Sequence, residues 1–471
     1  MNIEGGFGMA VMGRGGVVKR LRGFGRVLGT VLMVTAPGIG MSAPVLAGSV
    51  LAGSVLAGSV LAAEKTSAEG AAEETQPFES WLAAFRQEAA AAGIGAQTLD
   101  DALDGVAPIA RVIELDRRQP EFTRTFWTYL GNRVTEARIE HGREMLAKHR
   151  ARLDRVARRH GVPAHYLVSF WGMETNFGRH LGSFPVIDSL ATLAHDPRRS
   201  DFFRAELLDA LRIVDGGHIG SKAMKGSWAG AMGHMQFLPS TFVNHAVDAD
   251  GDGRKDIWNS LDDAFASGAN YLSDMGWKAD ERWGREVRLP EDFEWTLASL
   301  RTRKTLDAWA ALGVRRADGG ALPTPEGMRG SLVLPQGHEG PAFLVYDNFR
   351  AILNWNRSVN YAVAVGHLAD RLVGQPALKT GRDVPNEPLS REAVVDLQKS
   401  LNRNGFDAGD PDGLPGPQTR AAIRRFQKAA GHPADGHPAP GVLEQLAAYA
   451  EAQSTEAQST ESQSAESQSR N

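Results

Sequence analysis

Residues 163–182 read PAHYLVSFWGMETNFGRHLG. Pro163 suits the first turn of a helix, and Gly178 is a residue at which a helix can end or break. The stretch therefore predicts a helix that begins at Pro163 and reaches Phe177, rich in apolar and aromatic residues. Glu174 is the carboxyl group of this helix.

Aromatic side chains surround Glu174 at helical spacing. Phe170 and Trp171 precede it by four and three positions, and Phe177 follows it by three, so all share one helix face. A carboxyl group on such a face loses hydration and is expected to hold its proton to higher pH, as a general acid for glycoside cleavage must. The alternative is a structural carboxylate at the rim of a core helix, paired with Arg179 or another base.

The pattern of apolar residues around this helix predicts a mainly α protein of α+β type. Apolar residues recur at three- and four-residue spacing over most of residues 78–373, whereas residues 285–349 carry short apolar runs between Gly and Pro turns. We therefore expect a helical domain with a small β-containing insertion at about 285–349. Further helices are expected at 142–160, 201–214, 262–275 and 349–372.

The length of 471 residues suits two or three domains. The formal charge is −4, with no long Lys/Arg run, which argues against nucleic acid as a ligand. There is no cysteine, which excludes disulfides, a thiolate nucleophile and a cysteine-linked lipid anchor. The predicted divisions are a signal peptide (1–63), a linker (64–77), a first domain (78–373), a second linker (374–388), a small helical module (389–449) and a disordered low-complexity tail (450–471).

The N-terminus has the layout of a secretory leader. Five basic residues between 14 and 26 precede the apolar run 27–36, and small-residue repeats follow. The run is too short to span a bilayer, so no stable membrane span is expected after leader removal. The predicted location is the periplasm; the alternatives are a disordered apolar extension and a retained anchor.

Two further stretches combine rings with directed polar groups. The Gly-rich stretch, 225–242, reads KGSWAGAMGHMQFLPSTF and includes Ser227 and Gln236; residues 348–361 read NFRAILNWNRSVNY and include Asn356 and Tyr361. Such mixtures suit a sugar-binding groove, in which apolar platforms hold rings and polar groups bind hydroxyls. A tight helix-packing corner is the equal alternative for the Gly-rich stretch.

Taken together, the three stretches resemble the lytic murein transglycosylases of the B type, from about residue 78 to 372. The resemblance rests on WGMETNFG at 171–178, GSWAGAMGHMQFLPS at 226–240 and the segment 348–361. It implies a lysozyme-like catalytic domain, peptidoglycan glycan strands as substrate, and Glu174 as the catalytic residue. By the same resemblance, the groove is lined by Ser227, Gln236, Tyr271, Asn356 and Tyr361.

This family is understood to use one carboxyl group where most glycosidases use two. Glu174 would protonate the oxygen between N-acetylmuramic acid and N-acetylglucosamine, and then take the proton of the C6 hydroxyl that attacks C1. The 1,6-anhydro product forms without water, and no cofactor is expected for the chemistry. Asp188 or Asp196 as a second carboxylate would instead give a hydrolytic muramidase. A non-catalytic wall-binding or scaffold protein is the remaining alternative.

A candidate metal loop follows the Gly-rich stretch. Residues 248–256 read DADGDGRKD, which matches the start of an EF-hand loop with Gly at position 6, but position 12 is Asn259 instead of Glu. The resembling family closes a longer loop at position 15, here Asp262. We expect a structural calcium ion; the alternative is an Asx-turn at a helix start. The expected ligands are Asp248, Asp250, Asp252, the Arg254 carbonyl and Asp262.

The module at 389–449 resembles a small peptidoglycan-binding domain of three helices. The resemblance rests on LQKSLNRNGF at 397–406, Asp412-Gly413 and AAIRRFQ at 421–427. Helical spacing predicts that the core consists of Leu397, Leu401, Ile423, Phe426 and Leu446. Its expected role is to hold the first domain at polymeric substrate through a linker.

Overall fold

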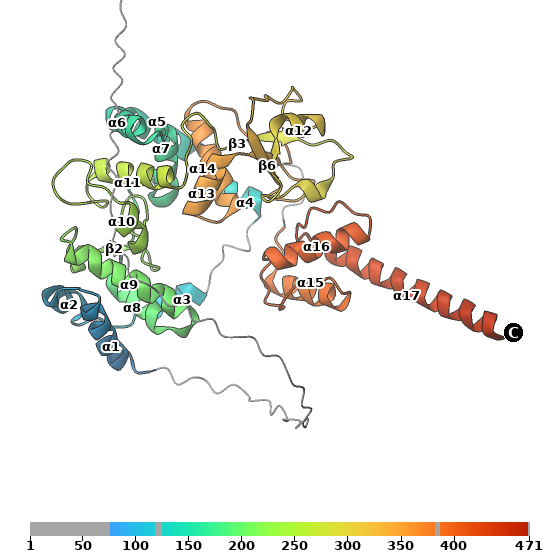
Figure 1. The fold of residues 1–471 in the computed structure, drawn as a ribbon, viewed down its shortest axis with the longest axis horizontal. Helices are drawn as coiled ribbons and strands as arrows, with labels where there is room; N and C mark the ends of the chain where they lie inside the picture. The colour runs from blue at the N-terminus through green and yellow to red at the C-terminus, as the bar shows by residue number, and fades with distance from the viewer. Residues whose placement is uncertain (1–75, 118–124, 382–386, 470–471) are drawn as a thin grey trace, which may run out of the picture. The chain divides into compact units, whose positions relative to one another are not determined.

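The computed structural model describes residues 76–117, 125–381 and 387–469. The predicted leader at 1–63 lies outside these residues, as do most of the linker 64–77 and part of the linker 374–388. Helices dominate the first domain (Figure 1). They are α1 (Phe78–Ala91), α2 (Ala96–Leu103), α3 (Ala110–Arg117), α4 (Phe126–Arg133), α5 (Glu136–Lys148), α6 (Arg150–His160), α7 (Ala164–Thr175), α8 (Val186–His195), α9 (Ser200–Asp215), α10 (Pro239–His245), α11 (Leu261–Asp274), α13 (Asp347–Trp355) and α14 (Val359–Leu372).

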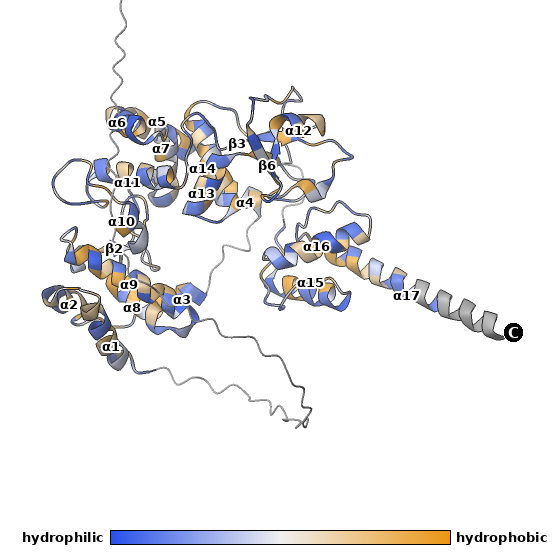
Figure 2. Ribbon diagram, viewed as in Figure 1, coloured by the Kyte–Doolittle hydropathy of each residue, from blue (hydrophilic) through white to orange (hydrophobic). Residues whose placement is uncertain are grey.

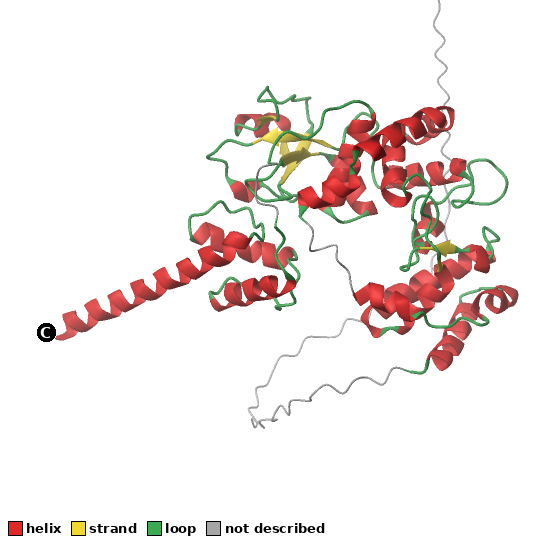
Figure 3. Cartoon of the chain, turned by 180° about the vertical axis from the view of Figure 1, so that it is seen from behind, coloured by secondary structure: helices red, strands yellow, loops and turns green. Residues whose placement is uncertain are grey.

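The predicted β-containing insertion is a five-stranded antiparallel sheet with the α-helix α12 (Leu306–Ala311) and a short 3₁₀ helix at Trp295–Leu297. The strand order is β4-β6-β7-β3-β5, and Leu332 pairs with Leu344 in the register of β6 and β7. Figure 3 shows the strands in yellow among the helices. They are β3 (Gly284–Arg288), β4 (Lys304–Thr305), β5 (Arg315–Arg316), β6 (Arg329–Val333) and β7 (Ala342–Val345). The sheet and α12 bury their own core around Trp309, separate from the helical core.

Helix α7 lies within the helical core and packs against α5, α6, α11 and α14. Nine of its twelve residues are buried, as expected for a helix that is apolar around its whole circumference. Figure 2 shows that most other helices carry both polar and apolar residues. Truncating a buried aromatic residue of α7 such as Phe170 to alanine would destabilise the protein by roughly 3–5 kcal/mol. The core therefore fixes α7, and with it Glu174, in place.

Side-chain caps explain where several helices begin. Thr135 Oγ1 accepts from the Arg138 backbone N–H at 3.2 Å at the start of α5, and Ser260 Oγ accepts from Asp263 at 3.2 Å at the start of α11. Pro239 occupies the first position of α10, where its missing N–H costs nothing. These caps satisfy backbone donors that a helix leaves unpaired.

The small module contains α15 (Arg391–Arg403), α16 (Pro417–Ala429) and α17 (Pro440–Ser469). All five core residues predicted for it are fully buried. The segment predicted as a disordered tail is helical as far as Ser469. Its Ala, Glu and Gln residues favour helix without requiring an apolar face. Within the described residues, no helix combines the length and apolar character needed to cross a membrane.

The expectation of a mainly helical α+β protein with a small sheet is confirmed, with three differences in the helices. The helix predicted at 349–372 is two helices, α13 and α14, with residues 356–358 between them. The helix predicted at 142–160 is two helices, α5 and α6, that meet at His149. The helix predicted to reach Phe177 ends at Thr175, because Asn176 has φ of 50° and leaves the helical region. Asn tolerates this left-handed conformation better than most residues.

Candidate active site

Glu174 lies half-buried in the last turn of α7 and meets a tyrosine from α14. Its Oε1 accepts a hydrogen bond from the Tyr361 hydroxyl. Ser358 Oγ caps α14 by accepting from the Tyr361 backbone N–H at 3.3 Å. Ser169 Oγ, on α7, donates to the Val365 carbonyl of α14 at 2.7 Å. The packing of two helices thus sets the geometry of the Glu174–Tyr361 pair.

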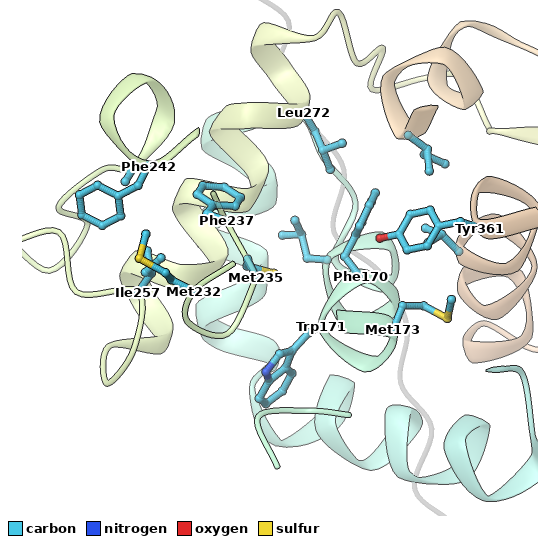
Figure 4. Close-up of a cluster of buried hydrophobic side chains, with 14 of the residues drawn as sticks. Phe170, Trp171, Met173, Met232, Met235, Phe237, Phe242, Ile257, Leu272 and Tyr361 are labelled. Carbon is cyan, nitrogen blue, oxygen red and sulfur yellow. The ribbon is translucent and has the colours of Figure 1, made fainter. Parts of the chain in front are cut away.

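Tyr361 stays a hydrogen-bond donor over the physiological pH range. Burial raises its pKa well above the usual value, and the neighbouring Glu174 carboxylate raises it further. Figure 4 shows its hydroxyl pointing toward Phe170 among buried side chains. The phenol therefore holds its proton and can stabilise negative charge on Glu174.

Five rings form what we call the aromatic wall: Phe170, Phe237, Tyr271, Trp355 and Tyr361. The Phe170 ring lies 4.4 Å from Trp355 and 6.4 Å from Tyr361. Trp355 is also 5.5 Å from Phe237 and 5.2 Å from Tyr271. The rings come from α7, the Gly-rich stretch, α11 and the segment 355–361, and Figure 4 labels Phe170, Phe237 and Tyr361. The wall thus brings the three stretches singled out in the sequence together.

The Gly-rich stretch begins with a close approach of two backbones, where β1 (Phe184–Pro185) pairs with β2 (Lys225–Gly226). Gly182 has φ of +92°, and a Cβ there would lie 2.1 Å from the Gly226 carbonyl group. Ser227 Oγ accepts from the Ala229 and Ala231 N–H groups at 3.3 and 3.0 Å. The backbone is therefore tightly packed at this point, and the Ser227 O–H remains able to donate.

Gln236 and Asn356 are partly used by the protein itself. Gln236 has φ of 50°, and its Nε2 donates to the Leu181 and Gly233 carbonyls at 3.1 and 3.0 Å. Asn356 Oδ1 accepts from the Ser358 N–H at 3.0 Å. The Gln236 amide oxygen and the Asn356 amide nitrogen are the atoms left for a ligand.

Tyr271 belongs to the same wall, but its hydroxyl is engaged. The hydroxyl donates to the Asn354 carbonyl at 2.9 Å, which ties α11 to α13. Burial raises the Tyr271 pKa, so it too remains a neutral donor. Its ring is therefore the part that faces other groups of the wall.

The remaining carboxyl groups considered from the sequence have other surroundings. Asp196 accepts from Arg117 Nη2 at 2.7 Å and from the Arg198 N–H at 3.1 Å. Asp188 lies in the first turn of α8, where burial raises its pKa.

Phe177 differs from its expected position because α7 ends before it. Its ring instead packs 4.9 Å from His141 on α5.

We call the segment Asp248–Asp256 the cation loop. Three of the carboxylates predicted as metal ligands lie close together in it. Asp248, Asp250 and Asp252 each offer an oxygen within 4.8 Å of the others. Asp248 accepts from the Gly251 and Gly253 N–H groups at 2.6 and 2.9 Å. An oxygen-only set on a loop with two left-handed glycines fits the ligand preference of calcium.

Asp262, the predicted closing ligand, faces elsewhere. Its carboxylate pairs with Arg152 at 2.8 Å and with Arg155 at 3.0 Å, both on α6. Its neighbour Asp263 is fully buried and accepts from the backbone N–H groups of Ala249 and Asp256 at 2.8 and 2.7 Å. Asp263 therefore lies against the loop and Asp262 does not; a helix turns adjacent residues about 100° apart.

A family model described as the transglycosylase SLT domain matches residues 77–370, more than half of the chain. The chain belongs to this family. A peptidoglycan binding domain model matches residues 390–446. The resemblance found in the sequence is thereby confirmed for both parts.

Solved structures of this SLT family are similar to the chain along most of their length. SltB3 from Pseudomonas aeruginosa, in complex with NAG-anhNAM-pentapeptide, is 49% identical with a TM-score of 0.76, covering 79% of this chain and 99% of that one. Escherichia coli Slt35 in complex with calcium is 28% identical with a TM-score of 0.54, covering 62% and 92%.

A curated relative, the membrane-bound lytic murein transglycosylase B of Escherichia coli K12, is 32% identical over 242 residues. That match covers 50% of this chain and 64% of the relative. The chain thus spans less than two thirds of this relative's length.

The peptidoglycan binding module contains a repeated corner that the sequence analysis missed. Buried Gln398 donates to Asp412 Oδ1 at 2.9 Å and accepts from the Gly413 N–H at 2.9 Å. Buried Gln427 makes the same pair of bonds to Asp435 and Gly436, at 2.9 and 2.8 Å. The signal was present in the sequence as two Gln residues, each followed by an Asp-Gly pair. These glutamines hold the module together.

Two side chains of the SLT domain that lie near Tyr361 were not predicted from the sequence. Tyr129 and Arg133, on α4, lie close enough to Tyr361 to shift its pKa, upward and downward respectively. The Arg133 guanidinium stacks 5.7 Å from the Tyr129 ring. Nothing in the spacing of α4 relates it to residues more than two hundred positions later, so only the fold reveals this proximity.

Proposed function

We propose that the protein is a lytic murein transglycosylase that cleaves the bond between N-acetylmuramic acid and N-acetylglucosamine in peptidoglycan. The observation that carries the proposal is Glu174, held by Tyr361 beside the aromatic wall. The relative SltB3, solved with an anhydro-sugar pentapeptide, supports the same chemistry. Such a site offers a general acid next to two partly exposed rings, Tyr271 and Trp355, against which sugar rings can pack.

The first step is protonation of the glycosidic oxygen by Glu174. Because Tyr361 donates to Oε1, the other carboxyl oxygen carries the transferred proton. As the bond breaks, an oxocarbenium-like centre forms at C1, which the acetamido oxygen of the substrate can stabilise. The Glu174 carboxylate left behind keeps the Tyr361 hydrogen bond, and hydrogen bonds to ionised groups are the stronger ones.

In the second step the Glu174 carboxylate accepts the proton of the C6 hydroxyl, and that oxygen attacks C1 to give the 1,6-anhydro end. The free donor of Ser227 and the free amide atoms of Gln236 and Asn356 supply polar partners for hydroxyl and acetamido groups. Tyr271 contributes its ring. The reaction needs proton transfers alone and no cofactor.

The two alternatives differ in what they require of the site. A hydrolytic muramidase needs a second carboxylate to activate water, but Asp196 is paired with Arg117. A non-catalytic scaffold needs no titrating group in its groove, so this alternative does not explain the Glu174–Tyr361 pair. Mass spectrometry of digested peptidoglycan separates these cases. We expect 1,6-anhydromuramic ends; reducing ends would establish the hydrolase, and no cleavage would establish the scaffold.

The cation loop would hold a structural calcium ion. Asp248, Asp250 and Asp252 lie close enough to share an ion, Arg254 would add its carbonyl, and the relative Slt35 has been solved with calcium. Asp262 would have to leave two arginines to close the site, whereas Asp263 already lies against the loop. We therefore favour Asp263 over Asp262 as the closing carboxylate. The ion would stabilise the fold without taking part in the chemistry.

The module at 389–449 would bind peptidoglycan and keep the catalytic domain near its substrate through the linker 374–388. The location that fits these activities is the periplasm, reached through the leader at 1–63. Sequencing the N-terminus of the protein isolated from cells tests this placement. An intact Met1 would contradict it, whereas a start near Ala63 or Glu64 is expected.

A further inference from the structure

The chain directly after Glu174 has an unusual backbone. Asn176 and Phe177 have φ of 50° and 61°, and Gly178 has φ of 80°, so three consecutive residues are left-handed. Residues other than glycine adopt this conformation at an energetic cost and persist there when the surroundings fix them. Contacts from outside α7 must therefore hold this helix end.

His234, from the Gly-rich stretch, contacts the helix end at three points. Its Nδ1 accepts from Trp171 Nε1–H at 3.0 Å, and its carbonyl oxygen accepts from the Thr175 hydroxyl at 3.0 Å. Its ring fills the space beside Gly178, where a Cβ would lie 2.5 Å from the His234 Cε1. Trp171 and Thr175 stand three positions before and one position after Glu174. One residue thus holds both sides of the turn that carries the carboxyl group.

His234 is itself fixed by the chain that follows the cation loop. Its backbone N–H donates to the Ile257 carbonyl at 3.0 Å. A Cβ on the preceding Gly233 would lie 2.6 Å from that same oxygen, so the two segments are in close contact. Figure 4 shows Ile257, Met232 and Trp171 within one cluster of buried side chains. His234 therefore has a firm support from which to hold α7.

The bond to Trp171 also fixes the chemistry of the imidazole. An indole N–H can only donate, so the His234 Nδ1 must be unprotonated and Nε2 carries the proton of a neutral ring. Burial lowers the His234 pKa, which favours the neutral ring. The neutral ring, with its acceptor at Nδ1, is thus favoured near neutral pH.

We infer that His234 is a positioning residue, which holds the last turn of α7 through Trp171 and so places Glu174 for proton transfer. This inference rests on the proposed function. His234 does not touch the reacting atoms; it acts through the helix end. Removal of the Nδ1 acceptor should therefore lower kcat and leave KM unchanged, because the groove that binds glycan is kept.

The test compares two variants of the full-length protein with side chains of nearly the same shape. His234→Asn keeps an acceptor near the position of Nδ1, whereas His234→Leu does not. With purified peptidoglycan glycan strands, we expect His234→Leu to lower kcat about tenfold, the effect of one hydrogen bond on a barrier, at unchanged KM. His234→Asn should stay within about twofold of wild type. Equal kcat losses in both variants, or no loss in His234→Leu, would overturn the inference.

Two controls keep the result interpretable if His234→Leu is unstable. In a Trp171→Phe background the N–H is already absent, so His234→Leu should cause no further fall in kcat; a second tenfold fall contradicts the proposed path. In NMR spectra, the Trp171 indole N–H resonance can be assigned by its loss in Trp171→Phe. Its chemical shift should change in His234→Leu and stay close to the wild-type value in His234→Asn. Anhydro products from every variant would show that the proposed function holds even where the role of His234 fails.

Discussion

Glu174 and the carboxylates of the cation loop present the same functional group in two opposite settings. Glu174 is half-buried, and its Oε1 meets the hydroxyl of a buried tyrosine beside aromatic rings. Asp250 and Asp252 are exposed, and Asp248, Asp250 and Asp252 accept from backbone N–H groups of their own loop. The comparison teaches that surroundings decide the role: a desolvated single acid can exchange a proton, and clustered carboxylates can hold a cation.

The largest expected effect comes from removing the proton of Glu174. Glu174→Gln keeps size and polarity but cannot act as acid or base, so turnover should fall about a thousandfold. Folding and wall binding should persist, as measured by thermal melting and by sedimentation with insoluble peptidoglycan. Asp250→Asn serves as the matched control, because it neutralises a carboxylate of the other setting and should retain turnover. Wild-type turnover in Glu174→Gln would show that Glu174, like the carboxylates of the cation loop, exchanges no proton in the reaction.

The next effect is on stability and concerns the cation loop. An ion that binds only the folded state at a hundredfold excess over its dissociation constant stabilises by about 2.7 kcal/mol. Added calcium should therefore raise the melting temperature, and magnesium should substitute poorly because it demands a smaller, octahedral site. Identical melting with calcium and with chelator would show that the loop holds no ion.

Single variants sharpen the choice of closing ligand in the same experiment. Asp263→Asn should lose most of the calcium response, whereas Asp262→Asn should keep most of it, because Asp262 pairs with Arg152 and Arg155. Asn259→Ala should also keep the response. The reverse order for the two acids would restore Asp262 as the ligand.

A smaller effect is expected from Tyr361→Phe, which removes the hydrogen bond to Glu174 but keeps the ring. The charged carboxylate formed in the first step loses its donor, so kcat should fall about tenfold. Tyr271→Phe is the matched control, since its hydroxyl bonds a backbone carbonyl instead of Glu174. Equal losses in the two variants would mean that the tyrosines act through packing alone.

The smallest effect on chemistry should follow removal of the C-terminal module after residue 374. Glu174 and the cation loop both lie within the first domain, and the core of that domain is separate from the core of the module. Cleavage of short soluble glycan should therefore be unchanged, while sedimentation with insoluble peptidoglycan should fall severalfold. Equal sedimentation of both forms would remove the targeting role of the module.

Local patterns in the sequence predicted a large part of this molecule. Helical spacing predicted the mainly α architecture and the module core around Leu397 and Phe426, and short apolar runs between Gly and Pro turns predicted the strands within 285–349. The three stretches meet at the aromatic wall, and Glu174 lies beside it. These features depend on periodicity and on short motifs, which a single sequence displays directly.

Other features depend on contacts that spacing does not encode. The left-handed residues after Thr175 move Phe177 off the helical face, and the bond between Trp171 and His234 joins positions 63 apart. Asp262 and Asp263 are neighbours in sequence, and the rotation of α11 decides which one lies against the loop. Tertiary packing decides these side-chain positions, and it can override what local sequence spacing predicts.

The central claim is that Glu174 acts alone, as acid and then base, so that no water enters the product. Digestion of purified peptidoglycan in ¹⁸O-labelled water, followed by mass spectrometry of the muramic ends, tests this most directly. We predict 1,6-anhydro ends without the heavy isotope. Reducing ends that carry ¹⁸O at C1 would contradict the claim, because they require a water molecule activated by a second group.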